Sequence, residues 1–352
     1  MSTEIAPRGR VRRTGAHRRD PVPRRPEALG RSGILPIIAL VAVAVIWGVT
    51  FSVVDLSVIN TGPVTPPPVD SANGTSPNSM PPADLVAWRF ALGAVLLVVF
   101  RLAIRRSALP RALRRRGVLL GAVFGLGFLL QAWAITYTDA LMSGFLTGML
   151  VVFAPVAGWL AFRDRPPASG WIAVGIATAG LALLSLRSSG FGPGELLTLL
   201  AAAVWALHLV LLSRWAEPEH AIGLACVQTA AVAGLALVTV AIGAAVNGRS
   251  PLPTVPDGGA EWLGVLFLAV LATAAAMVLL SWAQSRMSAT RAAIVLTLEP
   301  AVAGVTAACL GTELGAKSLA GGGLLLTAMV VVELRAHRDP VPDATPNEGR
   351  VV

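Results

Sequence analysis

Hydrophobic residues fall into long, nearly continuous runs along the chain, separated by shorter polar or Pro- and Gly-rich segments. A helix needs about 20 apolar residues to cross the ~30 Å hydrocarbon layer of a bilayer. By this measure the pattern predicts ten membrane-spanning helices. They are expected at residues 34–54, 83–103, 117–137, 140–162, 168–187, 194–214, 221–246, 261–283, 290–311 and 318–334.

These runs lack the alternation of polar and apolar residues that marks the strands of a membrane barrel. Backbone groups in lipid must bond within the protein, so only helices and closed barrels span a membrane. The sequence therefore predicts an all-α membrane protein. The first run is not expected to be a cleaved signal peptide, because it is too long and carries Trp47 to Phe51 where small residues would mark a cleavage site.

Composition agrees with this fold class. Of 352 residues, 55% are hydrophobic and 13% are charged, and the mean hydropathy is +0.71. A soluble domain carries about 25% charged residues, so a water-soluble enzyme is excluded. The two cysteines, Cys226 and Cys309, lie in separate apolar runs, which excludes a disulfide scaffold and a clustered cysteine metal site.

The distribution of basic residues predicts the orientation. The chain has 28 basic and 19 acidic residues, a net charge of +9. With the N-terminus inside, 24 basic residues fall on cytoplasmic segments, three on outer loops and one, Arg89, inside a helix. Because cytoplasmic loops collect Arg and Lys, we expect both termini to be cytoplasmic, in the cell membrane. Topology then accounts for the charge, and no nucleic-acid partner is predicted.

Both ends of the chain, and two of the loops, are polar. The Arg-rich residues 1–33 are predicted to be a disordered cytoplasmic tail, and residues 337–352 form a second tail. Residues 56–82 are rich in Pro, Gly, Ser, Asn and Thr and cannot continue a helix. Residues 247–260 repeat this composition more briefly. We expect both segments to be flexible outer loops; a lid over a binding site is the alternative.

An internal repeat becomes visible when the two halves are aligned with an offset of 149 positions. The first half covers residues 34–190 and the second covers 191–336. Each holds five predicted helices, and because this number is odd, the second half must be inverted across the membrane. Inverted repeats around a midplane site are typical of secondary transporters. The clearest matches are Trp133 with Trp282 and Asp164 with Glu313, with Trp47 near Trp205 and Arg89 near Gln228 in a looser register.

Several short motifs resemble the EamA domain of the drug/metabolite transporter superfamily. The motifs are Trp47-Gly48, Arg89-Phe90, the stretch from Ala140 to Gly148 followed by Ala154-Pro155, Trp282-Ala283-Gln284, Ser288 to Ala293, Leu298-Glu299-Pro300 and Gly311-Thr312-Glu313. The resemblance covers residues 34–334. It implies two EamA units and transport of small metabolites or drugs, often as export. This chain departs from the pattern in its first outer loop, which is about 19 residues longer than its counterpart.

Ionisable residues at membrane depth are expensive and mark functional candidates. Glu299 lies about nine residues into its helix, ~13 Å from the end at 1.5 Å per residue. The adjacent Pro300 removes a backbone donor and loosens the helix, so that the carboxylate and free carbonyls can face a cavity. Because low dielectric disfavours the charged form, Glu299 is a candidate for proton uptake and release. The alternative is a neutral side chain that hydrogen-bonds a neighbouring helix.

Arg89 lies about six residues inside the outer end of the second predicted helix. A guanidinium facing a cavity would bind carboxylate or phosphate groups. The alternatives are an anchor at the membrane interface or an ion pair with Asp84 or Glu299.

Other polar side chains at depth are weaker candidates. His208 shares a helix face with Trp205, and the pair either lines a cavity or packs with the histidine hydrogen-bonded. Neutral polar groups bind substrate or join helices to one another, and the second role is the more common. Those in the predicted helices are Gln131, Thr147, Gln228 and Thr297. Small-residue pairs, such as Gly121 with Gly125, indicate close helix packing.

The sequence has no phosphate-binding loop of the Gly-x-x-x-x-Gly-Lys-Ser/Thr type and no His-Glu-x-x-His motif. We therefore predict no catalytic residues, metal or cofactor. The expected function is alternating-access transport of a small molecule within the bilayer, driven by a proton or solute gradient; a homodimer is left open. An intramembrane enzyme acting on lipid is the rival interpretation, and it would need a second buried acid, base or metal ligand beside Glu299.

Overall fold

The computed structural model describes residues 34–54, 80–104, 108–138, 140–163, 168–185, 192–311 and 316–336, and within these ranges all regular structure is helical. The helices are α1 (Ile34–Val54), α2 (Pro82–Ala103), α3 (Arg111–Ala134), α4 (Ala140–Thr147), α5 (Leu150–Phe162), α6 (Ala168–Ser185), α7 (Pro193–Trp215), η2 (Pro218–His220), α8 (Ala221–Asn247), α9 (Gly259–Ala269), η3 (Val270–Ala275), α10 (Ala276–Gln284), α11 (Ala289–Leu296), α12 (Leu298–Cys309) and α13 (Ala316–Ala336).

Every predicted apolar segment coincides with helix. Seven helical segments are long and apolar enough to cross a membrane, which confirms the all-helical membrane fold for the described residues; the count of ten spans stays a prediction. The predicted start of the third helix at residue 117 is wrong, because α3 begins at Arg111. The apolar criterion rejects the arginines there, although arginine is a good helix former.

Three of the predicted helices are interrupted. One breaks between Thr147 of α4 and Leu150 of α5, and another at Thr297, between α11 and α12. At both breaks a threonine hydroxyl donates to the carbonyl three residues earlier, Thr147 to Gly144 at 2.6 Å and Thr297 to Ile294 at 2.6 Å. Such bonds compete with the helix ladder. The third interruption is η3, a π-helical turn between α9 and α10.

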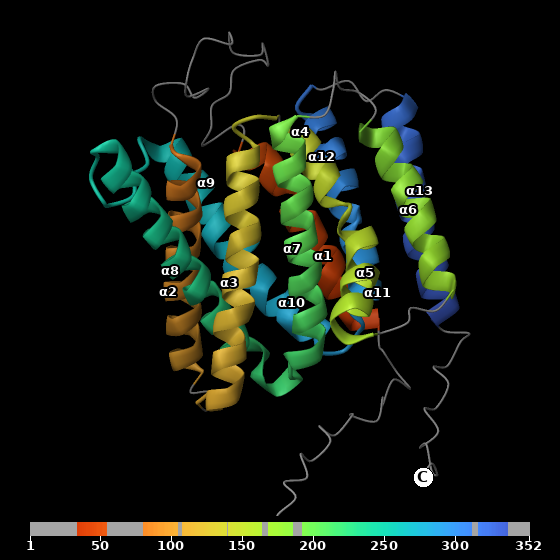
Figure 1. Ribbon diagram of the computed structural model, residues 1–352, viewed down its shortest axis with the longest axis horizontal. Helices are drawn as coiled ribbons and strands as arrows, with labels where there is room; N and C mark the ends of the chain where they lie inside the picture. The colour runs from red at the N-terminus through yellow and green to blue at the C-terminus, as the bar shows by residue number, and fades with distance from the viewer. Residues whose placement is uncertain are drawn as a thin grey trace, which may run out of the picture. The chain divides into compact units, whose positions relative to one another are not determined.

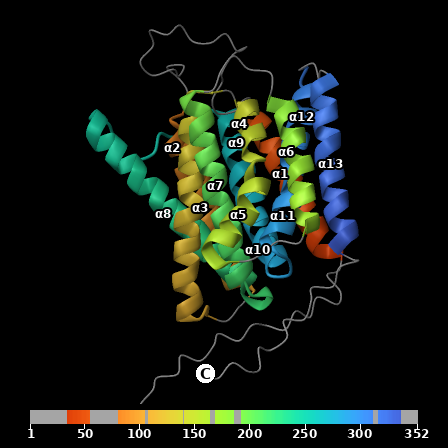
Figure 2. The same cartoon turned by 45° about the vertical axis from the view of Figure 1, so that its right-hand side comes forward.

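Helices from the two sequence halves pack against each other. Helix α6 packs along α13 and α2 along α8, while α3 contacts α7 and α8. Both ribbon views place α6 beside α13 (Figures 1 and 2). Helix α1 contacts α10, α11 and α12, and α7 contacts α4 and α5. Gly121 and Gly125 of α3 do lie against α8, at Gln228 and Val232.

For orientation, the face at which α1 ends and α2 begins is called the outer face, following the sequence prediction. The opposite face, where α7 ends and α8 begins, is the inner face. Both tails lie outside the described residues, as do residues 55–79 of the first predicted loop. The end of that loop is not exposed, because Met80 is buried against α2 and α9.

The prediction of a flexible loop over residues 247–260 is wrong for its first part. The buried carboxylate of Asp84 accepts hydrogen bonds from both terminal nitrogens of Arg249, at 3.1 Å each, and from the backbone N–H of Thr254 at 2.9 Å. Trp88 Nε1 donates to the Thr254 carbonyl at 2.8 Å. These bonds fasten the loop to the first turns of α2, and the sequence pattern gives no sign of this partner.

Candidate functional site

A cavity opens among the helices of both halves. The volume available to the centre of a water molecule is about 110 Å³, roughly ten times what one buried water needs. Its walls run from Glu299 and Leu280, within their helices, to Val54, Met80 and Pro82 at the outer ends of α1 and α2. The cavity therefore reaches from the interior of the bundle toward the outer face.

Arg89 of α2 lies in the wall of this cavity and is 7% exposed. Its Nε donates to Thr273 Oγ1 at 2.8 Å and its Nη2 to the Ala272 carbonyl at 2.9 Å. The guanidinium carbon lies 4.7 Å from the centre of the Phe128 ring. Both acceptors belong to the π turn η3. Arg89 is thus fixed by the irregular backbone of α9–α10 in the wall of the cavity.

One alternative for Arg89 was an ion pair with Asp84, but Asp84 pairs with Arg249 instead. Arg89 and Glu299 attract each other electrostatically. Glu299 is half-buried and lines the cavity from α12. The site therefore combines one fixed cation with one carboxylate.

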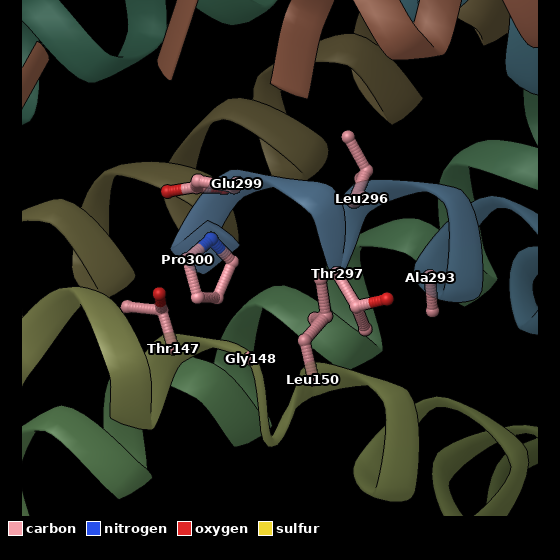
Figure 3. A pocket seen from close by; sticks show the side chains of 8 residues that line it. All are labelled: Thr147, Gly148, Leu150, Ala293, Leu296, Thr297, Glu299 and Pro300. Carbon is pink, nitrogen blue, oxygen red and sulfur yellow. The ribbon is translucent and has the colours of Figure 1, made fainter. Parts of the chain in front are cut away.

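Glu299 stands where the two broken helices meet. A small space of about 10 Å³, the size of one water, lies between the α4–α5 break and the α11–α12 break. Figure 3 shows Pro300 and Thr147 facing this space from opposite sides, with Leu150 across from Thr297. Broken helices that meet at mid-depth are typical of transporter binding sites.

Five aromatic residues form part of the remaining, mostly apolar wall. Trp47, Phe51, Phe124, Phe128 and Trp205 all line the cavity. Phe128 packs edge-on against Phe124 and Trp205, with ring centres 4.9 and 5.1 Å apart. The cavity is therefore a largely apolar chamber with few polar groups, as small-molecule sites commonly are.

The two tryptophans hold the chamber together in the same way. Trp47 Nε1 donates to the Ala272 carbonyl at 2.9 Å, and Trp205 Nε1 to the Phe124 carbonyl at 3.1 Å. Each bond joins the first helix of one half to the third helix of the other. Gly127 makes the second bond possible, because a Cβ there would lie 2.6 Å from Trp205 Cδ1.

The structure brings together five of the predicted site residues. Arg89, Gln131, Thr147, Trp205 and Glu299 line the cavity.

His208 and Trp205 do not line the cavity together. Trp205 lines it, and His208 does not. His208 is fully buried under the Phe124 ring and its Nε2 lies 2.7 Å from Gln228 Oε1. Gln228 is also fully buried. Thr297 borders only the small space at the breaks.

Sequence reasoning missed the aromatic wall. One helix face, with i, i+4, i+7 spacing, holds Phe124, Phe128 and Gln131. Since Gln131 was a candidate, the two phenylalanines could have been predicted to line the same site. Trp47 could have been predicted as a site residue, because it matches the candidate Trp205 in the internal repeat. Thr50, one turn beyond Ile46 and bonded to its carbonyl at 3.0 Å, had no such signal.

Comparison with known proteins agrees with these features. The EamA-like transporter family matches residues 74–186 and 192–334. An uncharacterized transporter from Archaeoglobus fulgidus is 26% identical over 299 residues, which are 85% of this chain and 85% of that protein. A solved crystal structure has the same fold, with a TM-score of 0.63 at 18% identity over 88% of this chain and 99% of that chain.

The family match falls on both halves of the sequence and covers most of the chain. Together with the apolar helices, it makes the protein a membrane transporter of small molecules and not an enzyme. The chain belongs to the EamA-like transporter family, within the drug/metabolite transporter superfamily.

Proposed function

We propose that the protein is a secondary transporter that moves a small organic solute through the cavity by alternating access. The observation that carries this proposal is the position of Glu299 and Arg89 in a chamber bordered by two broken helices. Helices interrupted in corresponding positions of two halves are a general pointer to the substrate site of a transporter. In this chain the breaks at Gly148 and Thr297 are separated by the repeat offset of 149 residues.

The proposal includes ten spans arranged as two inverted five-helix repeats, residues 34–190 and 191–336. The helix contacts support this arrangement, because exchanging the halves maps the contacts onto one another. Contacts of α1 with α10 and α12 correspond to those of α7 with α3 and α5. The α2–α8 and α6–α13 contacts each map onto themselves. The two tryptophan bonds described above are related by the same exchange.

The direction we propose is export across the cell membrane, with both termini in the cytoplasm. The bias of 24 cytoplasmic against three outer basic residues supports the orientation. In that orientation the cavity belongs to an outward-facing state. Export itself rests on the resemblance to exporters of this superfamily.

We assign the coupling role to Glu299. A carboxylate whose charge is costly in low dielectric takes up a proton in one state and releases it in another. Each tenfold change in proton affinity between the two states corresponds to ~1.4 kcal/mol of bias. Arg89 supplies the opposite charge, so a solute with a carboxylate or phosphate group gains from binding near it.

The rival proposal, an intramembrane enzyme acting on lipid, gains no support from the site. Among the described residues that line the cavity, Glu299 is the one carboxylate, and no histidine or cysteine accompanies it. An acid–base or metal mechanism needs such a second group.

Comparing the small molecules in cells and medium with and without the protein tests the function directly. Cells that make the wild-type protein should gain at least one solute in the medium that cells with Glu299→Gln protein retain. Equal solute profiles for the two proteins, at equal membrane levels, would refute transport through this site. Thr239→Ala, on α8 and outside the cavity lining, is the matched control and should behave as wild type.

A further inference from the structure

A second polar cluster lies next to the cavity, toward the inner face. We call it the inner polar cluster; its members are His208 of α7, Gln228 of α8 and Ser281 and Gln284 of α10, and each is 0% exposed. Their neighbours in sequence, Leu209, Leu280 and Ala283, belong to the apolar core. Four polar side chains in this setting require an explanation, because buried polar groups are costly in a membrane protein.

The cluster is only partly satisfied. Gln228 Oε1 lies 2.7 Å from His208 Nε2, and Gln228 Nε2 donates to Ser281 Oγ at 3.4 Å. His208 Nδ1 and both polar atoms of the Gln284 side chain have no partner among the described residues. Leaving one such group unpaired costs about 1–3 kcal/mol. These three buried atoms are therefore available for hydrogen bonds to water or to a solute.

A thin apolar layer separates the cluster from the cavity. The Phe124 ring lines the cavity on one side and covers His208 on the other, with ring centres 4.5 Å apart. Leu209 and Leu280 also line the cavity and directly adjoin His208 and Ser281 in sequence. Gln284 is the last residue of α10, at the inner face. The cluster therefore spans the distance between the cavity floor and the inner end of α10.

We propose that the inner polar cluster is a second solute-binding site, on the inner half of the transport path, and that it opens when the layer of Phe124, Leu209 and Leu280 parts. Gln228, Ser281 and Gln284 both donate and accept hydrogen bonds and carry no charge. They suit the hydroxyl or amide groups of a polar solute, and water. This inference rests on the proposed transport function and adds to it the route by which the solute reaches the inner face.

Thiol labelling tests the route. Ser281→Cys is made in a Cys226→Ala, Cys309→Ala background. The membrane-impermeant reagent sulfonatoethyl methanethiosulfonate is added outside inside-out vesicles, where it meets the inner face of the protein. We expect it to label at least tenfold faster than the native Cys226 in a Cys309→Ala protein. Cys226 is the matched control, because it is buried near Gln228 on α8 but its thiol donates to the Leu97 carbonyl of α2, away from the cluster.

Two further variants separate the possible failures. Gln284→Cys replaces Ser281→Cys if the latter does not fold, and should label equally fast. Gln131→Cys reports on the cavity and should label from the outer side. If Gln131→Cys labels from the outer side but Ser281→Cys and Gln284→Cys label no faster than Cys226, the second site is refuted and the proposed function stands. If Gln131→Cys itself is unreactive from both sides, the cavity is not a transport site and both proposals fall.

Discussion

Arg89 shows how one side chain serves both the fold and the site. Its two hydrogen bonds join α2 to the π turn of α9–α10, and its flat face lies on Phe128. An unpaired guanidinium would be expensive at this depth, but two acceptors and an aromatic ring offset that cost. The sequence identified Arg89 as a candidate, yet its partners Ala272 and Thr273 carry no motif.

Replacing Arg89 should therefore destabilise the protein as well as affect binding. Arg89→Ala removes two bonds from a charged donor, each worth about 1.5–3 kcal/mol, so unfolding should become easier by roughly 3 kcal/mol or more. Arg89→Lys keeps the charge but loses the planar, forked arrangement of donors. Its stability should lie between those of the wild-type and Arg89→Ala proteins. Thermal unfolding in detergent measures both; an Arg89→Ala protein as stable as wild type would show that these bonds contribute nothing.

Gly127 is a second residue whose identity is set by a contact. Gly127→Ala would push the Trp205 indole away from the Phe124 carbonyl, at an overpacking cost of about 1–3 kcal/mol. Gly234→Ala on α8 meets no atom within 4 Å and should be neutral or stabilise by about 0.5–1 kcal/mol, because alanine is the better helix former. Melting temperatures of the two variants should move in opposite directions, or the first alone should fall. Equal losses would mean that Trp205 is free to move aside.

At the scale of elements, the loop after α8, which is bonded to α2 through Arg249 and Thr254, leads to a further prediction. Asp84→Asn removes the charge that both Arg249 nitrogens contact. The segment from Arg249 to Thr254 should then detach and become accessible to protease, while Thr239→Ala, within α8, should leave cleavage unchanged. Limited proteolysis in membranes checks this. Equal cleavage of the Asp84→Asn and wild-type proteins would contradict the anchoring role of Asp84.

Apolar length predicts where the helices lie, but not where they are interrupted. Residues 140–162 read as one continuous run, and the break after Thr147 depends on a hydroxyl bond to Gly144 that hydropathy does not register. Pro300 did signal the break beside Glu299. The π turn η3 is made of Val, Leu, Ala and Thr, and Trp47 and Arg89 donate hydrogen bonds to its Ala272 carbonyl from other helices. Tertiary contacts decide such features, so a single sequence leaves them hidden.

For the molecule as a whole, the proposed orientation rests on the distribution of basic residues and leads to a separate prediction. In a background lacking Cys226 and Cys309, Ser107→Cys and Thr345→Cys should be shielded from an impermeant thiol reagent in intact cells, whereas Ser76→Cys should react. The reason is the excess of basic residues on the segments that hold positions 107 and 345. Labelling of Ser107→Cys in intact cells would reverse the orientation, and with it the side to which the cavity opens.

In the proposed mechanism, the exchange relation between the halves allows one chamber to face the two sides in turn. If the α1–α10 and α7–α3 contacts are equivalent, opening one set while closing the other moves access from the outer to the inner face. In the proposed mechanism, the structure corresponds to the state in which Phe124, Leu209 and Leu280, which line the cavity, close the inner side. The proposed mechanism assigns the coupling role to Glu299, which lies at the junction of the broken helices.

The most direct test of this account is solute flux in proteoliposomes that contain wild-type or Glu299→Gln protein, with a solute identified by the comparison of cells and medium. Glutamine mimics the protonated carboxyl group, so the variant should still exchange labelled for unlabelled solute but should lose net flux driven by a pH gradient. Wild-type protein should perform both. Undiminished pH-driven flux in the Glu299→Gln protein would contradict the coupling role and leave Glu299 as a residue of helix packing.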